Sequence, residues 1–180
     1  MRDYDDNEFP LAYLITFRCY GTWLHGDDRG SYRRSSNTIG RVVQIPPRPG
    51  LREAETAQLK HPSVQLNKKQ RKLIEEAIRE VCLHRRYVLY AVNARSNHVH
   101  SVVSASKAPE PILAAFKAYS TRALRRAGLD EKIQPWSRHG STVYLWKERH
   151  VDKAIEYVVL GQDHPFSVDD ADLSPPSRSG

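Results

Sequence analysis

The chain has 180 residues, and its 28 lysines and arginines outnumber its 21 aspartates and glutamates, which gives a net charge of +7 at pH 7. This length suits one domain with a sizeable core and is short for two independent domains. No apolar run resembles a secretory signal or is long enough to span a membrane, so the sequence predicts a cytoplasmic protein without membrane contact. The basic excess favours a polyanionic partner over a merely basic soluble protein.

The first half of the chain predicts one strand, one long excursion and one helix. Alternating side chains over residues 11–20 predict a β-strand. Residues 21–66 carry many charges, glycines and prolines without sustained periodicity, which indicates a long irregular excursion. Asn67 is a good N-cap for an amphipathic helix that ends near His84. Cys19 and Cys82 have no metal-ligand spacing, so we expect both in the core.

The second half continues with a hairpin, a helix, a strand and a helix. Residues 87–92 and 98–103 predict two strands joined by a turn over 93–97. Apolar spacing over 112–124 predicts a helix that Gly128 ends, and 141–146 and 151–160 predict a fourth strand and a final helix.

The order β-α-β-β-α-β-α indicates an α+β fold of the ferredoxin-like, split βαβ kind, with an antiparallel sheet and helices packed mainly on one face. We therefore expect one domain over residues 1–162, with the excursion at 21–66 inside it. Residues 163–180 are rich in Ser, Pro and Asp, and we expect them to form a mobile tail.

The segment Ser96-Asn97-His98-Val99-His100 carries the most specific chemical signal. On a strand, alternate side chains point the same way, so His98 and His100 share one face while Val99 faces the core. Two imidazoles on one face are a ready pair of metal ligands, although the pair alone names no metal. The alternative is a pair of solvated or hydrogen-bonded surface histidines.

This strand, together with Lys117-Ala118-Tyr119-Ser120 on the following helix, resembles the HUH endonucleases. The resemblance is to their single-tyrosine, IS200-like transposases, and closest to the REP-associated tyrosine transposases, and it spans about Leu11 to Gln162. It implies that His98 and His100 hold a divalent metal ion, Mg²⁺ or Mn²⁺, on the scissile phosphate of single-stranded DNA.

The resemblance further implies that Tyr119 attacks that phosphate, which yields a 5′-phosphotyrosine intermediate and a free 3′-hydroxyl at stem-loop DNA. Strand transfer would follow when a second 3′-hydroxyl reverses the reaction. Lys117 and Arg122 are the nearby cations that would favour a phenolate. Against this role stands the helical spacing of Tyr119 from Phe116 and Ala123, which also suits a buried stripe.

One position departs from the family pattern, in which a polar third metal ligand lies four residues after the tyrosine. Ala123 stands there and binds no metal. Gln134, His139 and His25 are the candidate replacements. The departure keeps a second function open, that of a domesticated DNA- or RNA-binding protein that cuts weakly or not at all. A plain metalloprotein ranks last because no further hydrolase motif is present.

Two loops, residues 20–30 and 136–142, combine aromatic, glycine and basic residues and are predicted to grip DNA, with buried turn residues as the alternative. The short bridge at 105–111 favours a helix packed on its own sheet, and hence a monomer over a homodimer. The predicted DNA-binding residues are Arg18, Trp23, His25, Arg29, Arg95, Asn97, Lys117, Arg122, Arg125, Arg126, Arg138 and His139.

Overall fold

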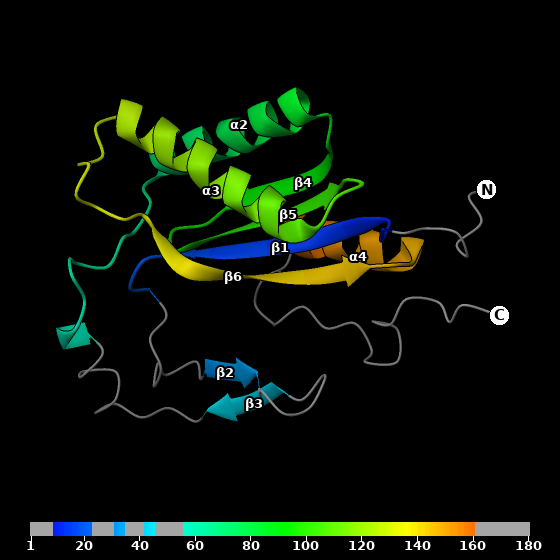
Figure 1. Cartoon of the computed structure of the whole chain (residues 1–180), viewed down its shortest axis with the longest axis horizontal. Helices are drawn as coiled ribbons and strands as arrows, with labels where there is room; N and C mark the ends of the chain where they lie inside the picture. The colour runs from blue at the N-terminus through cyan, green and yellow to red at the C-terminus, as the bar shows by residue number, and fades with distance from the viewer. Residues whose placement is uncertain (1–8, 23–30, 35–41, 46–55, 161–180) are drawn as a thin grey trace.

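Four antiparallel strands form the sheet on which the helices pack (Figure 1). The computed structural model describes residues 9–22, 31–34, 42–45 and 56–160, and for the two short segments it describes the backbone alone. The strand order across the sheet is β4-β5-β1-β6, so the first strand of the chain lies in the interior. The strands are β1 (Ala12–Cys19), β4 (Val88–Ala94), β5 (His98–Ser104) and β6 (Trp136–Leu145).

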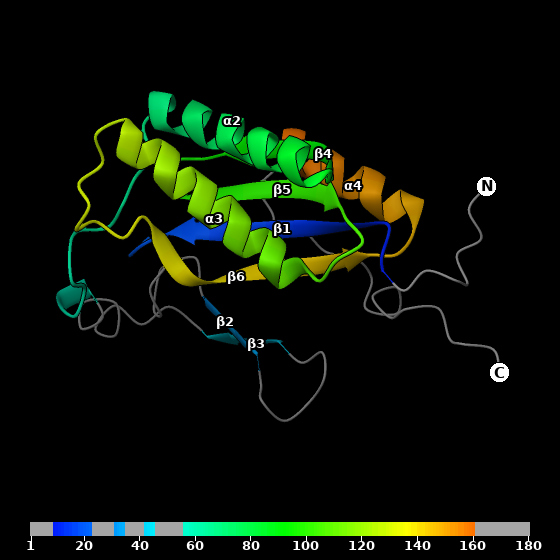
Figure 2. The ribbon, with the colours of Figure 1, turned by 45° about the horizontal axis from the view of Figure 1, so that its top comes forward.

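Two helices, α2 (Lys68–Arg85) and α3 (Pro109–Arg126), lie side by side on one face of this sheet, and α4 (Glu148–Val159) lies on the other (Figures 1 and 2). The element order β-α-β-β-α-β-α and the antiparallel sheet confirm the predicted α+β split βαβ fold. Two further strands, β2 (Ser31–Arg34) and β3 (Val42–Ile45), pair with each other within the predicted irregular excursion.

The helix α2 begins where the sequence predicts. The Asn67 side chain accepts a hydrogen bond from the Gln70 backbone N–H (2.9 Å), and the Gln70 side chain accepts one from the Asn67 N–H (3.0 Å). This capping box satisfies two donors that a helix start leaves unpaired. The helix ends at Arg86, whose left-handed backbone (φ 58°) turns the chain directly into β4.

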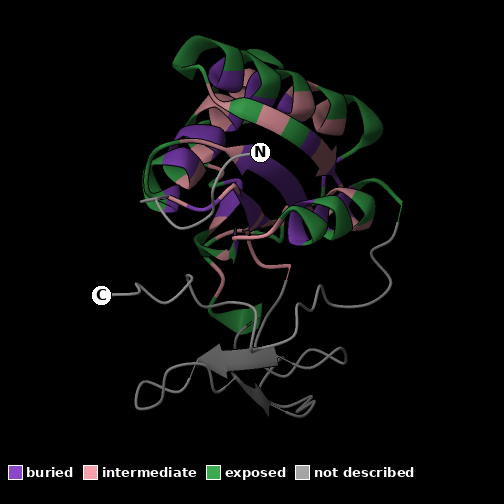
Figure 3. Cartoon of the chain, turned by 90° about the vertical axis from the view of Figure 1, so that its right-hand side faces the viewer, coloured by how far each residue is buried: buried purple, intermediate pink, exposed green. Residues whose placement is uncertain are grey.

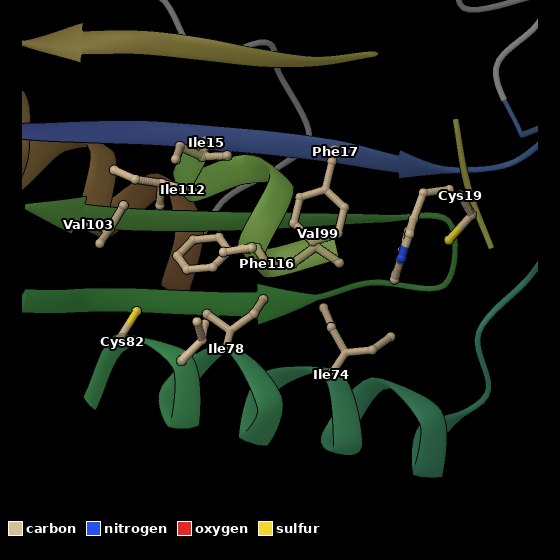
Figure 4. Packing of buried hydrophobic residues seen from close by; sticks show 14 of the residues in the cluster. Ile15, Phe17, Cys19, Ile74, Ile78, Cys82, Val99, Val103, Ile112 and Phe116 are labelled. Carbon is tan, nitrogen blue, oxygen red and sulfur yellow. The ribbon is translucent and has the colours of Figure 1, made fainter. Parts of the chain in front are cut away.

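The larger hydrophobic core lies between the sheet and α2 and α3 (Figure 4). Every second residue of β5, beginning with Val99, points into it, as do the odd-numbered residues of β1. Burial raises the pKa of both free thiols in this core to about 12. The core side chains labelled in Figure 4 are Ile15, Phe17, Cys19, Ile74, Ile78, Cys82, Val99, Val103, Ile112 and Phe116.

The opposite face of the sheet is apolar only where α4 covers it. Buried residues of the strands meet Val151, Ala154 and Val158 of α4, and Figure 3 shows buried and exposed residues alternating along that helix. Further along the same strand face the residues become polar. The strand residues of the apolar part are Ala12, Leu14, Ala91, Val102 and Leu145.

Several boundaries differ from those predicted; α4, for example, begins at Glu148 instead of residue 151. The strand β6 begins at Trp136 instead of residue 141, so the predicted loop over 136–142 is part of the sheet. The reason is packing: Trp136 is buried edge-on against Phe17, with ring centroids 4.9 Å apart. The turn before β5 is likewise shorter than predicted, because β4 continues to Ala94. Along the described segments, no helix has the length and apolar character needed to cross a membrane.

Candidate active site on the α4 face

The two histidines of β5 lie together on the face of the sheet that α4 covers. Their neighbours in the strand, Val99 and Val103, pack under α2 and α3, whereas Val102 packs under α4, so His98 and His100 share the side of Val102. Their ring centroids are 4.5 Å apart. The predicted juxtaposition of the two imidazoles is therefore present, with His100 buried and His98 partly exposed.

Hydrogen bonds fix the orientation of both rings. His98 Nδ1 lies 2.6 Å from the Asn97 side-chain oxygen, and His100 Nδ1 lies 2.7 Å from the hydroxyl oxygen of Thr16 on β1. Asn97 is itself held, since its carbonyl accepts a hydrogen bond from the Cys19 backbone N–H (2.9 Å). With each Nδ1 engaged by an oxygen, Nε2 is the ring nitrogen suited to ligating a metal ion.

His100 is neutral at physiological pH. Burial, together with the positive charges of His98, Arg18 and Arg95 acting in the same direction, lowers its pKa to about 3. A neutral imidazole keeps the lone pair that a metal ion needs. The strand register places Arg18 directly opposite His98, so a guanidinium flanks the histidine pair on β1.

A tyrosine from α4 completes this cluster. The ring of Tyr157 lies 5.2 Å from the ring of His100, centroid to centroid, in an edge-on arrangement. Asn93 of β4 donates a side-chain hydrogen bond to the carbonyl of Val158 (2.9 Å), which holds this turn of α4 on the sheet. Burial raises the pKa of the Tyr157 hydroxyl, and the positive charge of Arg18 acts in the opposite direction.

Tyr119, the nucleophile that the resemblance implies, lies elsewhere. It packs against the core between the sheet and α2 and α3, on the far side of the sheet from His98 and His100. The guanidinium of Arg122 lies 4.1 Å from the centroid of its ring. Within one chain, Tyr119 therefore lies away from the histidine pair and Tyr157 lies beside it, and the buried-stripe interpretation of Tyr119 fits its position.

The sequence also contains a signal that points to Tyr157. The last helix has an apolar stripe made of Val151, Ala154 and Val158. This stripe accounts for the packing of the helix, so Tyr157 is not needed to explain it. In the split βαβ order the two earlier helices cover one face, so the last helix is the one available to the other face. Only the side-chain direction of the histidines, which a sequence pattern does not give, decides which helix they meet.

The candidates for a third metal ligand lie apart from the histidine pair or outside the described residues. The Gln134 side chain donates to the Trp136 carbonyl (3.3 Å) beside α3, and His25 lies outside the described residues. His139 is exposed on β6 and shares, by strand alternation, the face of Ser141, the register partner of Thr16. Over the described segments, no three His, Cys, Asp or Glu side chains are grouped to hold a metal ion.

The predicted DNA-binding residues fall into separate groups. Lys117 donates to the carbonyls of residues 137–139 (2.9–3.3 Å), and Arg125 donates to those of Asp130 and Ile133, so both cations hold the chain between α3 and β6. Around the histidine pair or on its face of the sheet lie Arg18, Arg95, Asn97 and His139. On the α3 side lie Arg122, Arg126 and Arg138. Outside the described residues lie Trp23, His25 and Arg29.

Comparison with known proteins gives one match. The family model described as "Transposase IS200 like" matches residues 59–156, which is more than half of the chain. The matched segment contains α2, β4, β5, α3 and β6 and most of α4, and therefore both histidines and Tyr119; it ends one residue before Tyr157. No curated protein and no solved structure matches the chain.

Proposed function

This chain belongs to the family of IS200-like transposases, and we propose that it cleaves and rejoins single-stranded DNA through a covalent bond to Tyr157. Membership of the family makes it a DNA cleavage and transfer enzyme in general terms. One observation carries the specific proposal: the His98–His100 pair and the Tyr157 ring meet at a single place on the α4 face of the sheet.

The donor set fits a divalent metal ion with remaining oxygen ligands. Both imidazoles are oriented through Nδ1, and His100 is neutral. Imidazole suits first-row ions such as Mn²⁺, whereas Mg²⁺ prefers oxygen, so we propose Mn²⁺ or Mg²⁺ with DNA and water oxygens beside the histidines. When bound, the ion would supply positive charge that polarises the scissile phosphate.

Tyr157 performs the covalent step. Its hydroxyl gives its proton to solvent, and the Arg18 guanidinium favours the resulting phenolate against the effect of burial. The phenolate oxygen forms a bond to phosphorus while the bond from phosphorus to the 3′ oxygen breaks, and the leaving 3′ oxygen takes a proton from water. A 5′-phosphotyrosine and a free 3′-hydroxyl result. Attack by a second 3′-hydroxyl reverses these changes and rejoins the strands.

We further propose that the substrate is a stem-loop with the cut in its single-stranded flank, as in the REP-associated relatives that the sequence resembles. The exposed end of the polar strand face offers His98, Arg18 and His139 to that flank. Because His100 and Tyr157 meet within one chain, a monomer would suffice for cleavage. The second candidate is a DNA- or RNA-binding protein that cuts weakly. It is favoured because, among the described residues, two histidines are the whole set of grouped metal ligands.

The test is a search for a covalent adduct between protein and DNA. Labelled hairpin oligonucleotides with single-stranded flanks are incubated with Mn²⁺ or Mg²⁺ and separated on a denaturing gel. We expect an adduct with the wild type that is lost in Tyr157→Phe and in His98→Ala and retained in Tyr119→Phe, the matched control on the other face.

Three results would argue against parts of this proposal. An adduct that survives in Tyr157→Phe and disappears in Tyr119→Phe would restore Tyr119 as the nucleophile. An adduct that reappears when Tyr157→Phe and His98→Ala chains are mixed would show that two chains share each site. Binding of DNA without an adduct over a broad set of substrates would support the non-cutting alternative.

A further inference from the structure

On the side of the sheet opposite the histidines, α2 and α3 lie side by side (Figures 1 and 2), and each helix carries basic residues in its last turn. Between them is a hollow of about 450 Å³, within the range of about 300–1,000 Å³ typical of ligand sites. This α2–α3 groove is lined by Glu80, Leu83, His84, Tyr119, Arg122 and Arg126, with Ala123 beside them.

The groove carries cations that the described part of the chain does not neutralise. Arg122 and Arg126 are exposed, and neither forms an ion pair with any residue in the described segments. Glu80 is the one acidic side chain in the lining. Arg85 and Arg86, both exposed, extend the positive charge at the end of α2. These arginines differ from Lys117 and Arg125, whose hydrogen bonds hold the loop after α3.

Tyr119 has a place in this groove. Its ring is partly buried against the core, and the Arg122 guanidinium lies over it at 4.1 Å from the centroid. Such a contact holds the guanidinium in place against the ring. Its N–H donors lie in the guanidinium plane and are not used by the ring face, so they stay available. The small side chain of Ala123 leaves room beside Arg122 and Arg126. Ala123, four residues after Tyr119, thus lines this groove on the face opposite the histidines.

We propose that the α2–α3 groove binds the phosphate backbone of the DNA away from the cut, so that the protein holds its substrate on both faces of the sheet. This inference rests on the proposed function for its partner. The planar guanidinium matches phosphate oxygens, and the net charge of +7 favours a polyanion. A short oligonucleotide at His98 and His100 lies on the other face, so only longer DNA reaches the groove.

The main test is the salt dependence of DNA binding. Fluorescence anisotropy compares the wild type with Arg122→Gln/Arg126→Gln on a long hairpin oligonucleotide. Each lost phosphate contact lowers the slope of log affinity against log salt by about 0.9, so the double variant is expected to lose about 2. The matched control is Lys107→Gln/Lys132→Gln, which removes the same charge from exposed loops before and after α3 and is expected to change the slope much less.

Three further binding measurements distinguish an effect of the groove from an effect of changed folding or total charge. Glu80→Gln is expected to strengthen binding of the long DNA, because it removes the one anion of the lining. An oligonucleotide of about six nucleotides, within the size of one single-strand site, is expected to bind the wild type and the double arginine variant equally. Tyr119→Phe keeps the ring beneath Arg122 and is expected to bind long DNA normally.

Several outcomes would overturn the inference. These are an unchanged salt slope in the double arginine variant, an equal loss in the lysine control, weakened binding of the short oligonucleotide, or weaker binding in Glu80→Gln. Because anisotropy measures binding without cleavage, failure of the adduct assay would contradict the proposed function and leave the test of the groove intact.

Discussion

The two faces of the central sheet differ in how completely they are apolar. The face under α2 and α3 is apolar along β1 and, apart from the buried Ser101, along β5, whereas the face under α4 is apolar at one end and carries Thr16, Arg18, His98 and His100 at the other. A buried polar group costs free energy unless it is hydrogen-bonded, and here His100 is both buried and bonded to Thr16. The first face supplies most of the core, and the second carries the candidate site.

The largest expected effect concerns the apolar face. Phe116 is fully buried in the core under α3, and Phe116→Ala should lower the free energy of unfolding by about 3–5 kcal/mol. Val151→Ala, on the α4 face at the rim of the smaller cluster, should cost clearly less, because Val151 is smaller and lies at the edge of that core. Urea denaturation measures both, and an equal loss would contradict the ranking of the two cores.

The next effect concerns metal binding on the polar face. Mn²⁺ at about a hundred times its dissociation constant should stabilise the folded wild type by about 2.7 kcal/mol, provided the unfolded chain does not bind it. Thermal unfolding measures this gain, which we expect to disappear in His98→Ala/His100→Ala and to remain in the control His84→Ala on the other face. A gain that persists without both strand histidines would place the metal elsewhere.

A smaller effect concerns acid. His100 has a pKa of about 3 in the folded metal-free protein and about 6.5 when unfolded, so between these values only the unfolded chain binds the proton. Stability should therefore fall as pH decreases from 6.5 towards 3, with His100 contributing at most about 1.4 kcal/mol per pH unit. Denaturation in EDTA measures the slope, and His100→Asn, with an amide near the position of Nδ1, should reduce it. An unchanged slope would show that His100 is not the group responsible.

The smallest effect concerns the two thiols of the apolar face. Burial raises the pKa of Cys19 and Cys82 to about 12, and the thiolate is the reactive form. Near neutral pH, iodoacetamide should modify neither residue in the native protein and both after denaturation. Mass spectrometry gives the result, and rapid modification of either native thiol would mean that the apolar face opens more readily than its packing indicates.

Much of the fold follows from local patterns in the sequence. The capping box at Asn67 and the alternation around Val99 are decided by neighbouring residues, and the structure has α2 and β5 within a residue or so of the predicted bounds. The start of β6 was predicted wrongly because the polar residues 137–141 hide a strand that is held by distant partners, Phe17 through Trp136 and Lys117 through the backbone.

The candidate site was predictable only in part, for a related reason. The pairing of His98 with His100 follows from alternation within one strand. The choice between Tyr119 and Tyr157 depends on which side of the sheet each helix covers, and both tyrosines lie on amphipathic helices with similar apolar stripes. Proximity in the sequence favoured Tyr119, whereas the topology favours Tyr157.

The position of Tyr157 has an evolutionary consequence. The helix that presents this tyrosine also supplies Val151, Ala154 and Val158, which cover the second apolar cluster of the sheet. A gene shortened before α4 would lose the proposed nucleophile and leave that cluster uncovered, so the truncated product would be prone to aggregate instead of persisting as a DNA-binding protein. Descent from a cutting to a non-cutting protein is therefore expected to proceed through single substitutions at the site, with α4 retained.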